Sequence, residues 1–178
     1  MNTDHLIKLA IENKRSAQKE FYEHFSPIAY GVIKRFIKDD YDAEDVLIET
    51  FIKVFENLSK FKNEGSFEGW IRKIAVRESL MFLRRNKMFN MFIEVDNINI
   101  SEKANITNIL EYNDLLKVLD LLPVGYRTVF NLYAIEGYQH NEIAELLNIS
   151  INTSKSQFRL AKERIKKLIE YQNKINIA

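Results

Sequence analysis

Apolar residues recur every three or four positions along almost the whole chain, and this spacing constrains the fold more than any other feature. A period near 3.6 places such residues on one face of an α-helix, whereas a half-buried strand alternates polar and apolar residues. Only five glycines and two prolines interrupt the pattern in 178 residues, so few positions break a helix. The sequence therefore predicts an all-α protein.

The N-terminal half carries apolar stripes that predict helices over about 21–36, 43–58 and 67–75. Pro27 predicts a kink or a restart in the first of these helices, because proline removes a backbone donor and its ring clashes with the preceding turn. Asp42 is the predicted N-cap of the second, since a carboxylate there accepts hydrogen bonds from the first turn.

The third helix should begin after Gly65, with Ser66 as its cap. Beyond it, an asparagine-rich stretch loses the helical periodicity, which indicates a connection rather than a packed element. We therefore expect two small helical domains joined by a linker, with boundaries at 1–87, 88–112 and 113–178.

Composition excludes several classes of function. The chain has no cysteine, so disulfides, thiolate metal sites and cysteine nucleophiles are excluded, and His5, His24 and His140 lack metal-ligand spacing. No glycine-rich phosphate loop is present, and neither a metal nor another cofactor is expected. The chain has no apolar run of the roughly 18 residues that a membrane span needs and no signal-peptide core, so we expect a cytoplasmic protein without membrane insertion.

A net charge of +1 conceals blocks of opposite sign. Acids dominate 40–68, whereas bases dominate 72–87 and the stretch from 151 onwards. Asp45 and Glu49 stand four residues apart, and such a like-charge pair costs about 0.2–0.5 kcal/mol on a helix unless a partner offsets it. A basic partner surface would do so, and an ordinary solvated acidic face is the alternative.

The segment FKNEGSFEGWIRKIAVRESLMFLRR interleaves aromatic and basic residues. This combination suits single-stranded nucleic acid, because stacking a base on an aromatic ring contributes about 1–3 kcal/mol while bases hold the backbone. Alternatively, Phe67 and Trp70 are core residues. We interpret Phe67 as partly a core residue and Trp70 as the better stacking candidate.

The stretch HNEIAELLNISINTSKSQFRLAKERI is typical of a helix-turn-helix. Asn148 can end the first helix in a left-handed conformation and Ser150 can cap the second. Ile151 and Ser154 are expected on the inner stripe of the second helix, although an apolar residue would fit better than Ser154. The outer face carries groups that bond phosphates and base edges, namely Asn152, Thr153, Lys155, Ser156, Gln157, Arg159 and Lys162. A helix hairpin with a solvated basic face is the alternative.

An acidic helix DAEDVLIETFIKVF, an aromatic–basic helix SFEGWIRKIAVRESLMFLRR, a linker, and LLPVGYRTVF before the helix-turn-helix follow one another. This order resembles the extracytoplasmic-function (ECF) group of sigma-70 family bacterial RNA polymerase sigma factors, over most of the chain. The resemblance implies a region 2-like helical bundle and a region 4-like helix-turn-helix. It also implies a protein that is not an enzyme and that directs core polymerase to promoters.

The resemblance implies three sets of site residues. The clamp helices of the largest polymerase subunit would be bound by Asp42, Glu44, Asp45 and Glu49. The melted minus-ten element would be bound by Phe61, Asn63, Ser66, Phe67, Trp70, Arg72, Lys73, Arg77, Arg84 and Arg85. The duplex minus-thirty-five element would be bound by Asn152, Thr153, Lys155, Ser156, Gln157, Arg159, Lys162 and Arg164.

The sequence departs from the family pattern at four positions. Ile48 stands where glutamine is common in the clamp helix, Glu78 where asparagine is common, and Gln157 where arginine is frequent. Gln139 replaces a usual serine cap. The resemblance to this family also implies an anti-sigma partner. The alternative function is an autonomous helix-turn-helix regulator with a helical N-terminal interaction domain.

Overall fold

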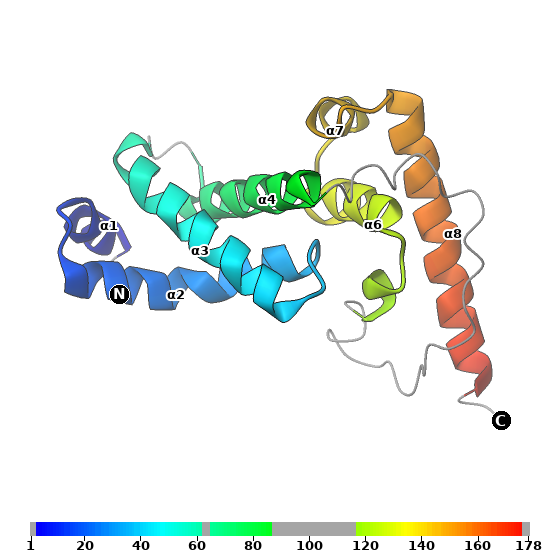
Figure 1. Ribbon diagram of the computed structural model, residues 1–178, viewed down its shortest axis with the longest axis horizontal. Helices are drawn as coiled ribbons and strands as arrows, with labels where there is room; N and C mark the ends of the chain where they lie inside the picture. The colour runs from blue at the N-terminus through cyan, green and yellow to red at the C-terminus, as the bar shows by residue number, and fades with distance from the viewer. Residues whose placement is uncertain (1–2, 62–64, 87–116, 176–178) are drawn as a thin grey trace. The chain divides into compact units, whose positions relative to one another are not determined.

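A computed structural model describes residues 3–61, 65–86 and 117–175, with side chains from 5 to 170 within those ranges (Figure 1). All regular elements in these ranges are helical. The chain divides into two compact units, Met1–Arg85 and Asn86–Ala178. The prediction of an all-α fold with two small helical domains is confirmed, and the predicted linker over 88–112 lies outside the described residues.

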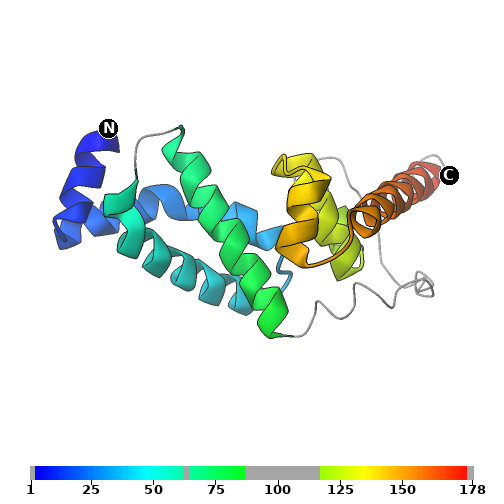
Figure 2. The same cartoon turned by 90° about the horizontal axis from the view of Figure 1, so that it is seen from above.

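The first unit contains helices α1 (Thr3–Ile11), α2 (Arg15–Lys34), α3 (Asp40–Asn57) and α4 (Phe67–Arg85), with a 3-10 turn η1 (Leu58–Lys60) after α3. Helices α2, α3 and α4 pack against one another, and α1 packs on α2 (Figure 2). The core is made by the apolar stripes that the sequence shows, including the fully buried Phe21, Val32, Phe36, Val46 and Ile71.

Helix ends in this unit agree with the sequence at one position and differ at another. Gly69 N donates to Ser66 Oγ at 3.4 Å after a left-handed Gly65 (φ 96°), as predicted. By contrast, the N-cap of α3 is Asp39, whose carboxylate accepts from Asp42 N at 3.0 Å, so the prediction of Asp42 was wrong. The helix begins at Asp40, so Asp42 lies in its first turn and donates to the cap. Helix α2 runs through Pro27 without a restart.

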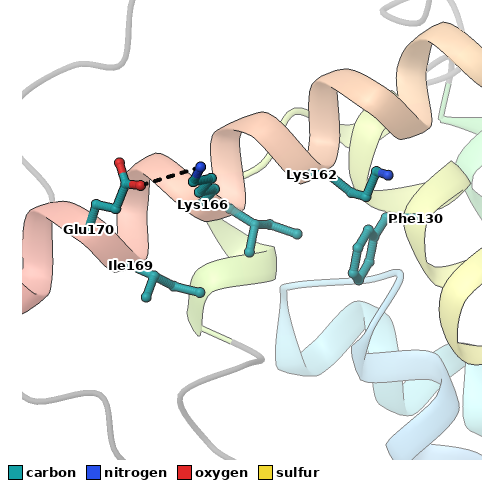
Figure 3. A pocket seen from close by; sticks show the side chains of 6 residues that line it. Phe130, Lys162, Lys166, Ile169 and Glu170 are labelled. Atoms are coloured by element: carbon teal, nitrogen blue, oxygen red, sulfur yellow. Dashed lines mark ion pairs between the residues drawn. The ribbon is translucent and has the colours of Figure 1, made fainter.

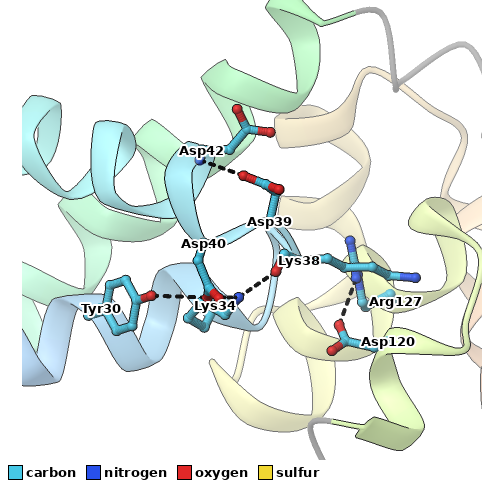
Figure 4. A network of polar contacts seen from close by, with 8 residues as sticks. All are labelled: Tyr30, Lys34, Lys38, Asp39, Asp40, Asp42, Asp120 and Arg127. Carbon is cyan, nitrogen blue, oxygen red and sulfur yellow. Dashed lines mark hydrogen bonds and ion pairs between the residues drawn. The ribbon is translucent and has the colours of Figure 1, made fainter.

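A polar network fixes the corner between α2 and α3 (Figure 4). Lys34 Nζ lies 2.7 Å from Asp40 Oδ1 and also donates to the carbonyl of Lys38, and Tyr30 donates to the same carboxylate oxygen at 3.3 Å. The neighbouring ammonium lowers the pKa of Asp40, whereas burial, followed by the charge of Asp40, raises the pKa of Tyr30. The start of α3 is therefore tied to the end of α2.

The described part of the second unit contains helical residues over 117–120, followed by α6 (Val124–Phe130), a π-helical turn η3 (Asn131–Ile135), α7 (His140–Leu147) and α8 (Ile151–Ile175). Helices α6 and α7 both pack on α8. The core includes Leu119, Leu122, Tyr126 and Ala161, with Phe130, Leu160 and Ile165 partly buried against them. Within this unit the buried Arg127 donates to Asp120 at 3.1 Å (Figure 4).

Removing the α3 cap should destabilise the first unit. We expect Asp39→Ala to lower its free energy of unfolding by about 1 kcal/mol, whereas Asp39→Asn retains most of the stability because asparagine caps equally well. Urea unfolding followed by the fluorescence of Trp70, the single tryptophan of the chain, reports this unit. Equal losses in both variants would show that the cap bond is not the cause.

Candidate nucleic-acid and protein interfaces

The outer face of α3 combines acidic and apolar side chains. Glu44 and Asp45 are exposed, and Asp42 and Glu49 are half-buried. Three exposed apolar residues lie on the same face at spacings of seven and four, namely Tyr41 (82% exposed), Ile48 (55%) and Ile52 (51%). Of these, only Ile48 was singled out from the sequence. We call these three the apolar spine. Exposed apolar residues in a row between acids form a surface suited to a protein partner.

Two residues that the sequence assigned to different surfaces bond each other in the structure. Arg85 Nη2 donates to both carboxylate oxygens of Glu49, at 2.8 and 3.1 Å, and so joins α4 to α3. Their side chains are 54% and 39% exposed, and ion pairs this exposed contribute about 0–1 kcal/mol. Because the pair is weak, a stronger binding partner can replace either member.

The aromatic residues before and at the start of α4 form one connected cluster. The Trp70 ring lies 5.5 Å from both Phe61 and Phe67, measured between ring centroids. The Phe67 ring also contacts two buried rings of α2, with its centroid 5.1 Å from that of Phe25 and 5.6 Å from that of Phe21. The half-buried Phe67 therefore packs partly on the core, as interpreted from the sequence, and Trp70 forms the half-buried outer end of the cluster.

The bases of α4 divide between faces. Lys73, Arg77 and Arg84 are exposed and follow Trp70 at spacings of three, four and seven, which places all four on one face. Arg72 is half-buried on a different face, and Arg85 is directed to Glu49. Ser66 bonds the backbone of α4, and Asn63 lies outside the described residues. The aromatic–basic face of α4 is thus Trp70, Lys73, Arg77 and Arg84.

The predicted helix-turn-helix is present in α7 and α8. Asn148 adopts a left-handed conformation (φ 53°, ψ 48°) at the end of α7, and Thr153 N donates to Ser150 Oγ at 2.9 Å at the start of α8. Gln139 precedes α7, and its backbone N–H donates to the Glu142 carboxylate at 2.7 Å. The substitution of a serine cap by Gln139 is therefore offset by Glu142, because the capping carboxylate satisfies one of the helix's first donors.

The inner Ser154 has a specific partner. Its side chain is fully buried, and its hydroxyl lies 2.9 Å from His140 Nδ1 across the two helices. The His140 ring stacks on Tyr133 at 4.3 Å and meets the edge of Phe158 at 5.9 Å. A serine is tolerated at this inner position because its hydroxyl is hydrogen-bonded rather than left unsatisfied.

The outer face of α8 differs from the prediction at Gln157 and Ile151. Gln157 is only 4% exposed, whereas Ile151, expected on the inner stripe, is 45% exposed. The reason is rotational, because the buried residues Ser154, Gln157, Ala161 and Leu168 follow one another at spacings of three, four and seven. Between 151 and 162 the exposed residues of α8 are Ile151, Asn152, Lys155, Ser156, Arg159 and Lys162, and we call these six the exposed face of α8.

Several predicted DNA contacts also make local interactions. The Thr153 hydroxyl bonds Ser150 at 2.8 Å, and Arg159 pairs with Glu163 at 2.6 Å. Lys162 Nζ lies 4.9 Å from the Phe158 ring centroid, and the half-buried Arg164 lies 5.3 Å from that of Tyr126. Arg159 and Lys162 remain exposed, so they can reach a ligand, whereas Thr153 and Arg164 serve the unit's own packing.

A shallow groove of about 270 Å³ lies along α8 beside the end of α6 (Figure 3). Its floor is Phe130, Ile165 and Ile169, and its charged rim includes Lys166 and Glu170, which lie 3.7 Å apart. In the described ranges no three His, Asp or Glu side chains are grouped as metal ligands would be. None of the helices described is long and apolar enough to cross a membrane.

Family models match two stretches of the chain. The model for sigma-70 region 2 matches residues 21–88, and the model for sigma-70 region 4 matches 112–165, so the two together cover more than two thirds of the sequence. The first match falls mainly on α2, α3 and α4, and the second includes α6, α7 and most of α8.

Curated relatives and solved structures are similar along most of the chain. The ECF sigma factor SigE of Mycolicibacterium smegmatis is 29% identical over 77% of this chain. The matched part covers 55% of the length of that relative. SigW of Bacillus subtilis is 22% identical over 90% of this chain and 93% of its own length. The structure of sigma factor RpoE with the anti-sigma factor NepR from Bartonella quintana matches with a TM-score of 0.53 and 19% identity, over 85% of this chain and 96% of that chain. CnrH in complex with the cytosolic domain of CnrY matches with a TM-score of 0.50 and 18% identity, over 93% and 96%.

Lowering the pH should reduce the stability of the second unit through the protonation of His140. Burial, followed by the charge of Lys155, lowers the pKa of His140 from 6.5, so the unfolded chain takes up the proton first as the pH falls. Stability is therefore complete above about pH 6.5 and declines below it. Trp70 fluorescence reports only the first unit, so thermal unfolding of the second unit is followed by far-UV circular dichroism. The midpoint temperature of its transition should be lower at pH 5.5 than at pH 7.5, and His140→Gln should reduce this difference. The same shift in both proteins would contradict a role for His140.

Proposed function

Because the chain belongs to the ECF group of the sigma-70 family, we propose that it directs core RNA polymerase to promoters by binding polymerase through α3, the minus-ten element through α4 and the minus-thirty-five element through α8. The observation that carries this proposal is the coincidence of two family regions with two folded units. The first unit exposes two helix faces, on α3 and α4, and the second exposes one, on α8, each with the chemistry that its assigned contact needs.

The outer face of α3 supports polymerase binding. The apolar spine supplies area that gains free energy when water is removed, and Glu44 and Asp45 beside it supply charge that fixes orientation. A clamp helix with bases beside apolar residues complements this face. Ile48, the departure from the family pattern, fits the same role because it extends the apolar contact.

The aromatic–basic face of α4 supports binding of a melted strand. The half-buried Trp70 is braced by Phe61 and Phe67, so its ring is held in place before a base stacks on it. Lys73, Arg77 and Arg84 continue the same face and would neutralise successive phosphates. Stacking and charge on one face favour unpaired bases over duplex. Binding a melted strand in this way requires no catalytic group on the protein.

The exposed face of α8 supports duplex reading. In a helix-turn-helix the second helix enters the major groove and its first turns contact base edges. Asn152, Lys155, Ser156 and Arg159 lie on those turns and Lys162 lies one turn further, nearer to phosphates. Because Gln157 is buried, we leave it out of the base-reading set.

An autonomous regulator is the weaker alternative. A protein that binds DNA alone gains affinity by neutralising phosphates, whereas a net charge of +1 provides little of that gain. A factor held on DNA by polymerase needs less. We further propose an anti-sigma partner, since RpoE, similar in fold, has been solved with one, and we place the protein in the bacterial cytoplasm, at the nucleoid when bound to polymerase.

Reversing charge on α3 should weaken polymerase binding. We expect the double variant Glu44→Lys, Asp45→Lys to bind core polymerase at least tenfold more weakly, because like charges would then face the basic clamp surface. Glu49 is left unchanged, since its reversal would also break the pair with Arg85. A matched control is Glu20→Lys, Glu23→Lys, which reverses two exposed acids on α2. Unchanged affinity of the α3 variant in a titration with core polymerase would remove this face from the interface.

Removing Arg159 should impair the use of the upstream promoter element. One good contact between arginine and a base edge contributes about 1–3 kcal/mol, so Arg159→Ala should lower initiation about tenfold at promoters that depend on that element. The control Arg15→Ala removes an exposed arginine from α2. Equal transcript yields from Arg159→Ala and the unchanged protein would exclude Arg159 from the reading set.

A further inference from the structure

One residue on the exposed face of α8, Ile151, has no contact assigned to it in the proposed function. Ile151 is the first residue of the helix, and its side chain is 45% exposed. Lys155 and Arg159 follow it at intervals of four residues on the same face, and Asn152 stands beside it. The sequence pattern predicts Ile151 on the inner stripe. In the structure Ser154 and Gln157 are buried, and this rotation of the helix places Ile151 on the face that would meet DNA.

The position suits an apolar contact with a base. The major groove presents hydrogen-bonding groups on every base pair and one apolar group, the C5 methyl of thymine. The N-terminal residues of a recognition helix lie closest to base edges. Isoleucine is branched at Cβ and has few side-chain rotamers, so little conformational entropy is lost when it is held against a methyl group.

We propose that Ile151 is a specificity-determining residue that contacts the C5 methyl group of a thymine in the minus-thirty-five element. The proposal rests on the proposed function, because it takes α8 as the helix that enters the major groove. It adds a preference that the polar residues cannot supply. Asn152, Lys155 and Arg159 bond oxygen and nitrogen atoms that uracil shares with thymine, whereas an apolar contact with the methyl group distinguishes the two.

Single replacement of thymine by deoxyuridine isolates this contact. Uracil keeps every hydrogen-bonding group of thymine and loses only the methyl group. Each thymine of the upstream element, on either strand, is replaced in turn, and initiation is measured with core polymerase and the full-length protein. At one position the replacement should lower initiation about three- to fourfold, which is the effect expected from one buried methyl group.

The variants then assign the effect to Ile151. With Ile151→Ala the thymine-to-uracil ratio at that position should fall to about one, and with Ile151→Val most of the preference should remain. Ile169→Ala, which truncates an isoleucine of α8 that is 46% exposed, should leave the ratio unchanged. The ratio compares two templates with one protein, so a general loss of stability does not move it.

The outcomes separate this inference from the proposed function. Three results would overturn the contact with thymine: no effect of uracil at any position, an unchanged ratio with Ile151→Ala, or an element that contains no A·T pair. Initiation that still requires the protein and still falls with Arg159→Ala would leave the proposed function standing. Failure of the unchanged protein to direct initiation on any template would overturn both.

Discussion

The packing of aromatic rings around Phe21 determines the form of the first unit. Phe21 of α2 contacts Phe55 of α3 at 5.4 Å and Phe67 of α4 at 5.6 Å, so one side chain joins three helices. Aromatic pairs of this kind contribute about 0.5–1.5 kcal/mol beyond the area that they bury. Because the same cluster extends through Phe67 to Trp70, the residues that hold the core also set the position of the proposed stacking platform.

Each proposed interface lies on the side of a helix opposite to its buried stripe. In α3, Val46 and Val54 are buried while Ile48 and Ile52 are exposed, and in α8, Ser154 and Ala161 are buried while Lys155 and Lys162 are exposed. The rotation of each helix about its axis therefore decides which side chains a partner meets. The Asp39 cap and the bond between Ser154 and His140 contribute to setting these rotations.

The pair between Glu49 and Arg85 places the proposed polymerase surface and the basic end of α4 in direct contact. If polymerase attracts Glu49, Arg85 loses a carboxylate partner and can turn to a phosphate instead. The energy involved is small because the Arg85 and Glu49 side chains are 54% and 39% exposed, so water screens the pair. The proposed binding of polymerase and of DNA would thus support each other, with a modest coupling between them.

Helical periodicity and turn residues allowed the fold class, the helix-turn-helix and the roles of Ser66, Asn148 and Ser150 to be predicted from sequence. These features depend on nearest neighbours in the chain. The N-cap at Asp39 was missed because several acids in a row offer equivalent caps. The exposure of Tyr41 and Ile151 and the burial of Gln157 were missed because they depend on how neighbouring helices pack, and a stripe with a polar member leaves the rotation of a helix ambiguous.

In the proposed function, two folded units together direct polymerase to a bipartite promoter. The most direct measurement is in vitro transcription of fragmented genomic DNA from the source bacterium, with sigma-free core polymerase in the presence and absence of the protein. We expect discrete transcripts that appear only with the protein, and their start sites should lie downstream of two shared elements at a constant spacing. No transcripts above core polymerase alone, together with specific binding of duplex DNA by the protein alone, would contradict it and favour an autonomous regulator.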